Sequence, residues 1–169
     1  DIWNKKLKIV TSKGKNHEVL VKDINGDRLC SYQDCNYKCK FCYAHFSKIK
    51  TNLNLYDGYK LLEEIKDNNI YKINFAGGEP LLNKNTGKFI KFSKEIGLKT
   101  SIITNASRMT NSWLMEYGRY LDQIGISCDS LNNNTNTKIG RGFGNHVEIT
   151  ERALKRINKM TNDFDLNIQ

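Results

Sequence analysis

Apolar and polar positions change period repeatedly along the chain, and this change predicts alternating strands and helices. Short stretches that are apolar at every second position or in continuous runs predict strands, at residues 27–32, 71–77, 99–106 and 122–130. Elsewhere apolar residues recur every three or four positions, which predicts helices over residues 54–69, 86–97, 111–121 and 146–160. A fifth strand is predicted within residues 163–169. Strands and helices that alternate four times are typical of parallel βαβ units, in either an open doubly wound sheet or a barrel.

The predicted helices carry the apolar faces and end signals that such units need. The first and the last each place four apolar residues on one face, namely Leu55, Tyr59, Leu62 and Ile65, and Ile149, Ala153, Ile157 and Met160. Gly97 is expected to end the second helix, and Asn111 is expected to cap the third.

The second predicted strand favours the barrel. One of its faces is apolar and the other is polar or small, comprising Tyr71, Ile73 and Phe75 and, opposite them, Lys72, Asn74 and Ala76. A parallel strand that is covered by helices on both faces is apolar on both, so the polar face is expected to line a lumen. An edge strand that turns its polar face to water is the alternative.

Length and composition bound the class of protein. A chain of 169 residues is long enough for one domain with its own core, and residues 1–27 form an extension with short predicted strands at 6–10 and 17–21. The net charge of +9 suits an anionic partner, although lysines on solvated helix faces explain it equally well. The five cysteines are an odd number and no apolar run approaches about eighteen residues, which favours a cytoplasmic protein without disulfides or a membrane span.

Three of the cysteines lie within eight residues, in the stretch "CNYKCKFC" that contains Cys35, Cys39 and Cys42. With His45 they form a possible zinc site of three thiolates and one imidazole. A redox pair of Cys39 and Cys42 is a second reading, which leaves Cys35 without a role. The third is an iron-sulfur cluster, which normally takes four thiolates, so that three would leave one iron open to a ligand.

The stretch "CNYKCKFCY" resembles the CxxxCxxC motif of radical S-adenosylmethionine (SAM) enzymes. The resemblance implies that Cys35, Cys39 and Cys42 hold a 4Fe-4S cluster, that the open iron binds SAM, and that Tyr43 contacts this cofactor. The motif "GGEP" supports it, because it follows the second strand at its carboxyl end, where barrel enzymes place their chemistry. By the same resemblance the motif holds the amino group of SAM, and its residues are Gly77, Gly78, Glu79 and Pro80.

Polar residues also follow the third and fourth strands. Asn105 is a candidate for the ribose of the cofactor, or alternatively a turn residue, and Ser127 is a candidate donor to the cofactor carboxylate. The loop "GRGFGNH" at residues 140–146 opens the last helix, and backbone N–H groups at such a position favour anions. Arg141 suits a carboxylate or a phosphate, and we favour the cofactor carboxylate.

Longer phrases narrow the resemblance to the viperin-like group of radical SAM enzymes; these are "KINFAGGEPLL", "YGRYLDQIGISCDS" and "IGRGFGNHVE". This implies a partial (βα)6 barrel of about four βα units and the start of a fifth strand, formed by residues 28–169 and truncated at its C-terminus. It also implies an enzyme that dehydrates a ribonucleoside triphosphate to the 3′-deoxy-3′,4′-didehydro nucleotide, an antiviral chain terminator, through a 5′-deoxyadenosyl radical. Lys72 and Asn74 are the candidate substrate contacts. Ala76 stands where animal members have serine, which leaves the preferred base open.

Two other functions compete with this one. A radical SAM peptide-modifying maturase shares the cysteine motif, and a basic zinc-binding nucleic-acid module would use the cysteines differently. The viperin-like reading implies a nucleoside triphosphate substrate and an electron donor such as a flavodoxin or ferredoxin. It implies neither a membrane nor a direct nucleic-acid partner.

Overall fold

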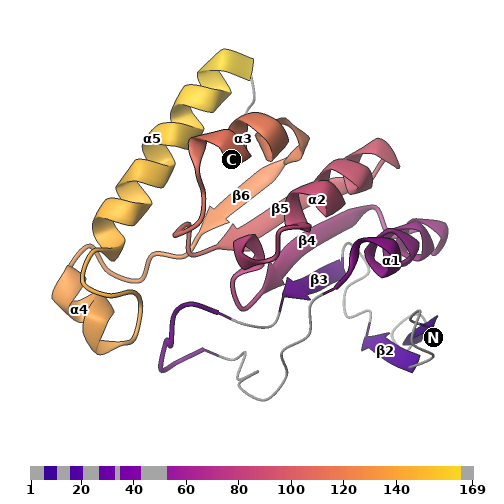
Figure 1. Cartoon of the computed structure of the whole chain (residues 1–169), viewed down its shortest axis with the longest axis horizontal. Coiled ribbons are helices and arrows are strands. Elements are labelled where there is room, and N and C mark those ends of the chain that lie inside the picture. The colour runs from indigo at the N-terminus through magenta and orange to yellow at the C-terminus, as the bar shows by residue number, and fades with distance from the viewer. Residues whose placement is uncertain (1–5, 11–15, 21–26, 33–34, 43–52, 165–169) are drawn as a thin grey trace.

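The computed structural model describes residues 6–10, 16–20, 27–32, 35–42 and 53–164 of the chain. Its centre is a sheet of parallel strands in the order β3, β4, β5, β6 (Figure 1). The strand bounds are β3 Asp27–Tyr32, β4 Lys72–Gly77, β5 Lys99–Thr104 and β6 Gln123–Ile126. A separate antiparallel pair consists of β1 Lys6–Val10 and β2 Asn16–Leu20. The extension over residues 1–27 thus contains the two strands expected of it, while its boundary as a domain stays a prediction.

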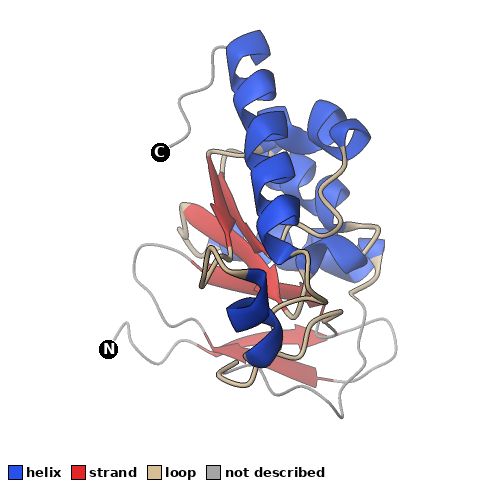
Figure 2. Cartoon of the chain, turned by 90° about the vertical axis from the view of Figure 1, so that its left-hand side faces the viewer, coloured by secondary structure: helices blue, strands red, loops and turns tan. Residues whose placement is uncertain are grey.

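Helices connect successive strands and lie on one face of the sheet (Figure 2). Their bounds are α1 Leu55–Asp67, α2 Thr86–Glu95, α3 Asn111–Tyr117, α4 Asn133–Lys138 and α5 His146–Phe164, with 3-10 turns at Pro80–Leu82 (η2) and Gly118–Tyr120 (η3). In a doubly wound sheet the strand order reverses and helices cover both faces. Here the order follows the sequence without a reversal, so the sheet is one wall of a barrel, and the predicted partial barrel is confirmed.

The two faces of β4 differ as the sequence predicts. Ile73 and Phe75 are fully buried beneath the helices, in a core shared with α1 and α2. Lys72 and Asn74 are on the opposite face and only partly buried. Tyr71 was expected on the apolar face, but it precedes the strand and is about half exposed, because the first ladder residue is Lys72.

A second apolar cluster joins α5 to α3 and the end of β5. Ala153, Ile157 and Met160 are buried there, which confirms the predicted inner face of the last helix, and Leu114 packs against them from α3. The cap of α3 is not the expected Asn111. Thr110 has extended backbone and its hydroxyl accepts a hydrogen bond from the Trp113 amide at 3.1 Å, so it is the capping residue.

The region after β5 departs most from prediction. The fourth strand ends at Ile126, four residues before the predicted end, and the unpredicted α4 follows. Residues 163–169 were expected to open a strand, but Asp163 and Phe164 belong to α5, and residues 165–169 lie outside the described part of the chain.

Candidate cluster and cofactor site

The cysteine loop rests on the loop that precedes α5. The Lys38 amide donates a hydrogen bond to the Gly140 carbonyl at 3.2 Å, and the Lys40 amide donates to the Ile139 carbonyl at 2.9 Å. Gly140 has φ +81°, and a Cβ atom added to it would lie 2.0 Å from the Lys38 carbonyl oxygen. Only glycine satisfies both conditions. The glycine-rich loop, expected to bind an anion, therefore supports the cysteine loop in this structure.

The side chains of Cys35, Cys39 and Cys42 are partly buried at this junction. The sulfur of Cys35 accepts from the Tyr37 amide at 3.4 Å and from the Asn105 side-chain amide at 3.9 Å. The thiol of Cys39 donates to the Gly140 carbonyl at 3.6 Å. Burial raises the pKa of both Cys35 and Cys39, so these groups are thiols until a metal centre replaces their protons.

Cys35, Cys39 and Cys42 are the candidate thiol ligands of a metal centre in the described part of the chain. Within residues 35–42 and 53–161, no three His, Cys, Asp or Glu side chains converge on one metal position. A zinc ion needs four ligands at about 2.0–2.3 Å from one centre. In a four-iron cluster each cysteine binds a different iron, so the thiolates lie further apart. His45 and Tyr43 lie outside the described residues.

Glu79 joins the ends of β4 and β5 as a buried carboxylate. It is fully buried, and its oxygens accept hydrogen bonds from the Thr104 hydroxyl at 2.5 Å, the Asn105 amide at 2.7 Å and the Leu81 amide at 3.1 Å. Burial raises the pKa of this carboxyl, although the three hydrogen bonds act to lower it. All three donors are neutral, and a carboxylate has about four acceptor positions. A cation such as an ammonium group would therefore stabilise its charged form.

The rest of the "GGEP" motif shapes the turn after β4. Gly77 has φ +144°, a conformation that side chains rarely adopt. Pro80 is the first residue of η2, where its missing N–H leaves no bond unmade, and Glu79 caps the same turn. Gly78 is partly buried between them.

Asn36 and Asn105 form a polar bridge that the sequence did not reveal. The Asn105 side-chain amide donates to the side-chain oxygen of Asn36 at 2.9 Å, and the side-chain NH2 group of Asn36 donates to the Ser107 hydroxyl at 2.8 Å. Asn105, proposed as a ribose contact, thus holds the cysteine loop to the end of β5. Asn36 lies between two cluster cysteines, and no local pattern distinguishes it from a solvated asparagine.

A buried histidine forms a second bridge. His146 starts α5, is fully buried, and donates from Nε2 to the Ser127 carbonyl at 2.8 Å. Its Nδ1 faces the Tyr37 hydroxyl at 3.4 Å, and burial lowers its pKa. The imidazole is therefore neutral near pH 7 and connects the cysteine loop to the end of β6. Ser127, the predicted cofactor donor, is held at this end through its main chain.

Arg141 projects from the same loop toward two neighbours. Its guanidinium forms an ion pair with Asp129 at 2.5 Å and lies 5.6 Å from the centre of the Phe41 ring. Its backbone amide donates to the Asn136 carbonyl at 2.8 Å, which fixes the loop to α4. The guanidinium has donors left for an anion, since an arginine carries five N–H groups.

The two substrate candidates lie toward the other end of the sheet. Lys72 begins β4 and donates to the Gln123 side-chain oxygen at 2.8 Å, and Asn74 accepts from the Ser101 hydroxyl at 3.0 Å. Lys99 is the register partner of Lys72, so two lysines share one row of the lumen face. Five steps of a strand at roughly 3.3 Å each separate this row from Gly77 by about 16 Å.

A barrel wall whose strand ends meet a loop of three cysteines is the arrangement expected of the radical SAM class. The chain belongs to the Radical SAM superfamily, whose family model matches residues 29–165.

Curated relatives share a single description. An S-adenosylmethionine-dependent nucleotide dehydratase of Lacinutrix mariniflava is 43% identical over 118 residues, which are 66% of this chain and 25% of that protein. A protein of Siniperca chuatsi with the same description, RSAD2, is 36% identical over 149 residues, or 79% of this chain and 42% of its own length. The chain thus spans 25% to 42% of the length of these two relatives.

Solved structures confirm the fold. Streptococcus suis SuiB bound to S-adenosylmethionine superposes with a TM-score of 0.69 at 20% identity, over 80% of this chain and 31% of SuiB. The enzyme anSMEcpe with bound AdoMet gives 0.57 at 16% identity, over 85% of this chain and 42% of that one. In the described part of the chain, no helix combines the length and apolar character needed to cross a membrane.

Proposed function

We propose that the full-length protein dehydrates a ribonucleoside triphosphate to its 3′-deoxy-3′,4′-didehydro form. The observation that carries the proposal is the 43% identity with a nucleotide dehydratase across 118 residues. The polar face of the barrel wall supports it, because a lumen with lysine and amide groups suits a phosphorylated substrate.

The residues at the carboxyl ends of the strands would hold cluster and cofactor. Cys35, Cys39 and Cys42 are the thiols for a 4Fe-4S cluster, and S-adenosylmethionine on that cluster supplies the 5′-deoxyadenosyl radical that removes a hydrogen atom from the substrate. The buried carboxylate of Glu79 would pair with the cofactor ammonium group. The remaining proposed cofactor contacts are Tyr43, Gly77, Gly78, Pro80, Asn105, Ser127 and Arg141.

The residues at the amino ends would hold the triphosphate. Lys72 and Asn74 lie about 16 Å and about 10 Å before Gly77 along β4, at roughly 3.3 Å per residue. A nucleotide that extends along the strand would place its phosphates near Lys72 and its ribose near the cofactor. This anchoring matters because the reacting atoms must be held about 3–3.5 Å apart.

The reaction also needs electrons from outside the chain. We propose a flavodoxin or a ferredoxin as the donor, and the cytoplasm as the compartment, because reduced thiols and a reduced donor coexist there.

The test uses the full-length protein reconstituted without oxygen. Release of 5′-deoxyadenosine is measured with dithionite as reductant, in the presence of CTP, UTP, GTP or ATP and without nucleotide. We expect one nucleotide to stimulate release strongly and to yield a product lighter by one water. Release that is independent of nucleotide would replace this proposal with a peptide substrate, and a cluster-loaded protein that releases none would exclude both.

A further inference from the structure

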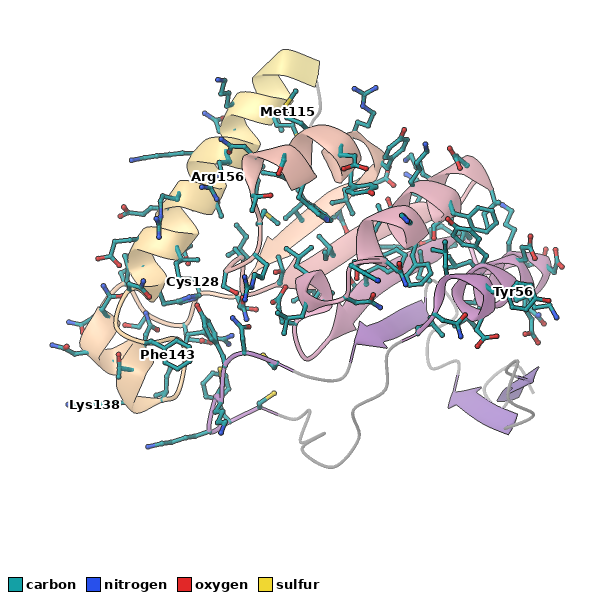
Figure 3. The ribbon with its side chains drawn as sticks, in the orientation of Figure 1. Tyr56, Met115, Cys128, Lys138, Phe143 and Arg156 are labelled. Carbon is teal, nitrogen blue, oxygen red and sulfur yellow. The ribbon has the colours of Figure 1, made fainter. Side chains whose placement is uncertain are left out.

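An exposed basic surface surrounds the cysteine loop. It comprises Lys38, Lys40 and Phe41 from that loop and Lys138 and Phe143 from the end of α4 and the loop that follows, and we call it the loop surface. Figure 3 shows Phe143 beside the cysteine loop and Lys138 further out, at the end of α4. The two segments are held together by the Lys38 and Lys40 amides, which bond to the Gly140 and Ile139 carbonyls.

The two aromatic rings of the loop surface are exposed, and packing within the described residues does not explain their exposure. Phe143 is 81% exposed and Phe41 56% exposed, whereas Tyr37 beneath them is buried. The Phe143 ring touches Tyr37 edge-on at 5.9 Å, and the Phe41 ring faces Arg141. Neither ring belongs to either apolar cluster of the described residues. Exposed aromatic side chains inside a polar rim are typical of a protein interface.

The charge of the loop surface is one-sided. Lys38, Lys40 and Lys138 are exposed lysines, while the neighbouring carboxylate of Asp129 is already paired with Arg141. Three exposed lysines, which form no ion pair with another described residue, surround the two rings and favour an acidic protein partner. Electric fields of this kind accelerate association.

We propose that the loop surface docks an acidic one-electron donor protein, an inference that rests on the proposed radical function. Phe41 and Lys40 lie between Cys39 and Cys42, so a partner on this surface sits against the loop that carries the cluster thiols. The donor gives up one electron there and is oxidised by one electron, and the cluster is reduced by one.

The test measures binding rather than turnover. The full-length, cluster-loaded protein is titrated with oxidised flavodoxin at low and high salt, and the dissociation constant is compared with that of the double variant Lys40→Glu, Lys138→Glu. The matched control is Lys88→Glu, Lys155→Glu, which changes the net charge equally at exposed lysines on α2 and α5. We expect at least about a tenfold weakening for the first pair, less than about twofold for the second, and a difference that shrinks in high salt.

Three results would overturn the proposal. If flavodoxin binding weakened equally in both double variants, the attraction would come from net charge alone. If binding did not weaken in the first double variant, the loop surface would not be the docking site. Tighter binding of a random single-stranded RNA, lost in the same variant, would assign the surface to nucleic acid.

A second variant guards against damage to the cluster. If the first double variant lowers the iron content, the binding test is repeated with the double variant Lys138→Glu, Phe143→Ser, because both positions lie outside the cysteine loop. Dithionite-driven release of 5′-deoxyadenosine should be unchanged in the variants. That assay separates the two proposals, since an absent nucleotide effect there rejects the dehydratase while flavodoxin binding still tests the surface.

Discussion

The core beneath α1 and α2 and the rim at the carboxyl ends of the strands are held together by different forces. In the core, the side chains of Ile73, Phe75 and Phe89 are fully buried in one apolar cluster. At the rim, Glu79, Asn105 and His146 are equally buried but each makes directed hydrogen bonds to a distant segment. The core therefore determines stability, and the rim determines whether the loops that carry the chemistry meet. Substitutions can test this division.

Loss of a cluster thiol should have the largest effect on activity with little effect on folding. Cys39→Ser is expected to abolish iron loading and 5′-deoxyadenosine release, because the cluster needs thiolates and Cys39 lies at the rim rather than in the core. Iron content and cofactor cleavage are measured together with the thermal midpoint. The control is Cys128→Ser, an exposed cysteine outside the loop, which should retain both. A loss of iron in the control would contradict the assignment.

Truncation in the core should produce the opposite pattern. Phe75→Ala is expected to lower the free energy of unfolding by about 3–5 kcal/mol, because it leaves a cavity between β4 and the helices. Phe143→Ala removes the same side chain from an 81% exposed position and should change stability by less than about 0.5 kcal/mol. Denaturant unfolding measures both. Similar values for the two variants would refute the distinction between core and rim.

Gly140→Ala should separate the two loops of the rim. Its new methyl group would lie 2.0 Å from the Lys38 carbonyl, in backbone with φ +81°, so the cysteine loop must move. We expect a loss of about 2 kcal/mol or more and a lower iron content. Gly144→Ala has the same type of strain at φ +97°, but its nearest atom is 4.0 Å away, so it should cost about 1 kcal/mol and keep the iron. Equal iron loading in both variants would show that the loop contact is dispensable.

The neutral His146 should make the rim sensitive to acid. Burial lowers its pKa, so the unfolded chain binds a proton near pH 6.5 that the folded chain does not yet bind. The free energy of unfolding should fall as pH drops through about 6.5, by at most about 1.4 kcal/mol per pH unit, until the folded state is also protonated. His146→Gln preserves a donor for the Ser127 carbonyl and should flatten this profile. An unchanged slope in the variant would assign the effect to another group.

Ala106→Gly is expected to have the smallest effect, and a favourable one. Ala106 has φ +61° directly after β5, a conformation that costs alanine about 1–2 kcal/mol. Glycine removes this strain but loses about 0.5–1 kcal/mol of chain entropy and the contacts of a buried methyl group, so a net gain of less than about 0.5 kcal/mol is expected. Asn69→Gly, at φ +60°, should gain less because asparagine tolerates this region. Thermal unfolding ranks the two, and a larger gain at Asn69 would contradict the reasoning.

Local patterns in the chain are enough to predict the class of the fold and the family. Period changes located β3 to β6 and the helices α1, α2, α3 and α5, because an element that buries one face must repeat with its own geometry. The spacing of Cys35, Cys39 and Cys42 and the order of "CxxxCxxC" and "GGEP" identified the family. Each of these signals lies within a short segment, so it can be recognised in the sequence without the structure.

Which segments meet at the rim cannot be predicted from such local patterns and follows from the folded arrangement. Cys39 and Gly140 are 101 positions apart in the sequence, and Tyr37 and His146 are 109 positions apart. No pattern within either segment predicts which segment it contacts. The support that Gly140 gives to the cysteine loop and the hydrogen bonds that Asn36 makes to the end of β5 depend on these contacts between distant segments. The helix α4 also escaped prediction, because its polar sequence "NNTNTK" has no apolar period. Hydrophobic patterning records burial against the sheet, whereas hydrogen bonds between loops leave no periodic trace in the chain.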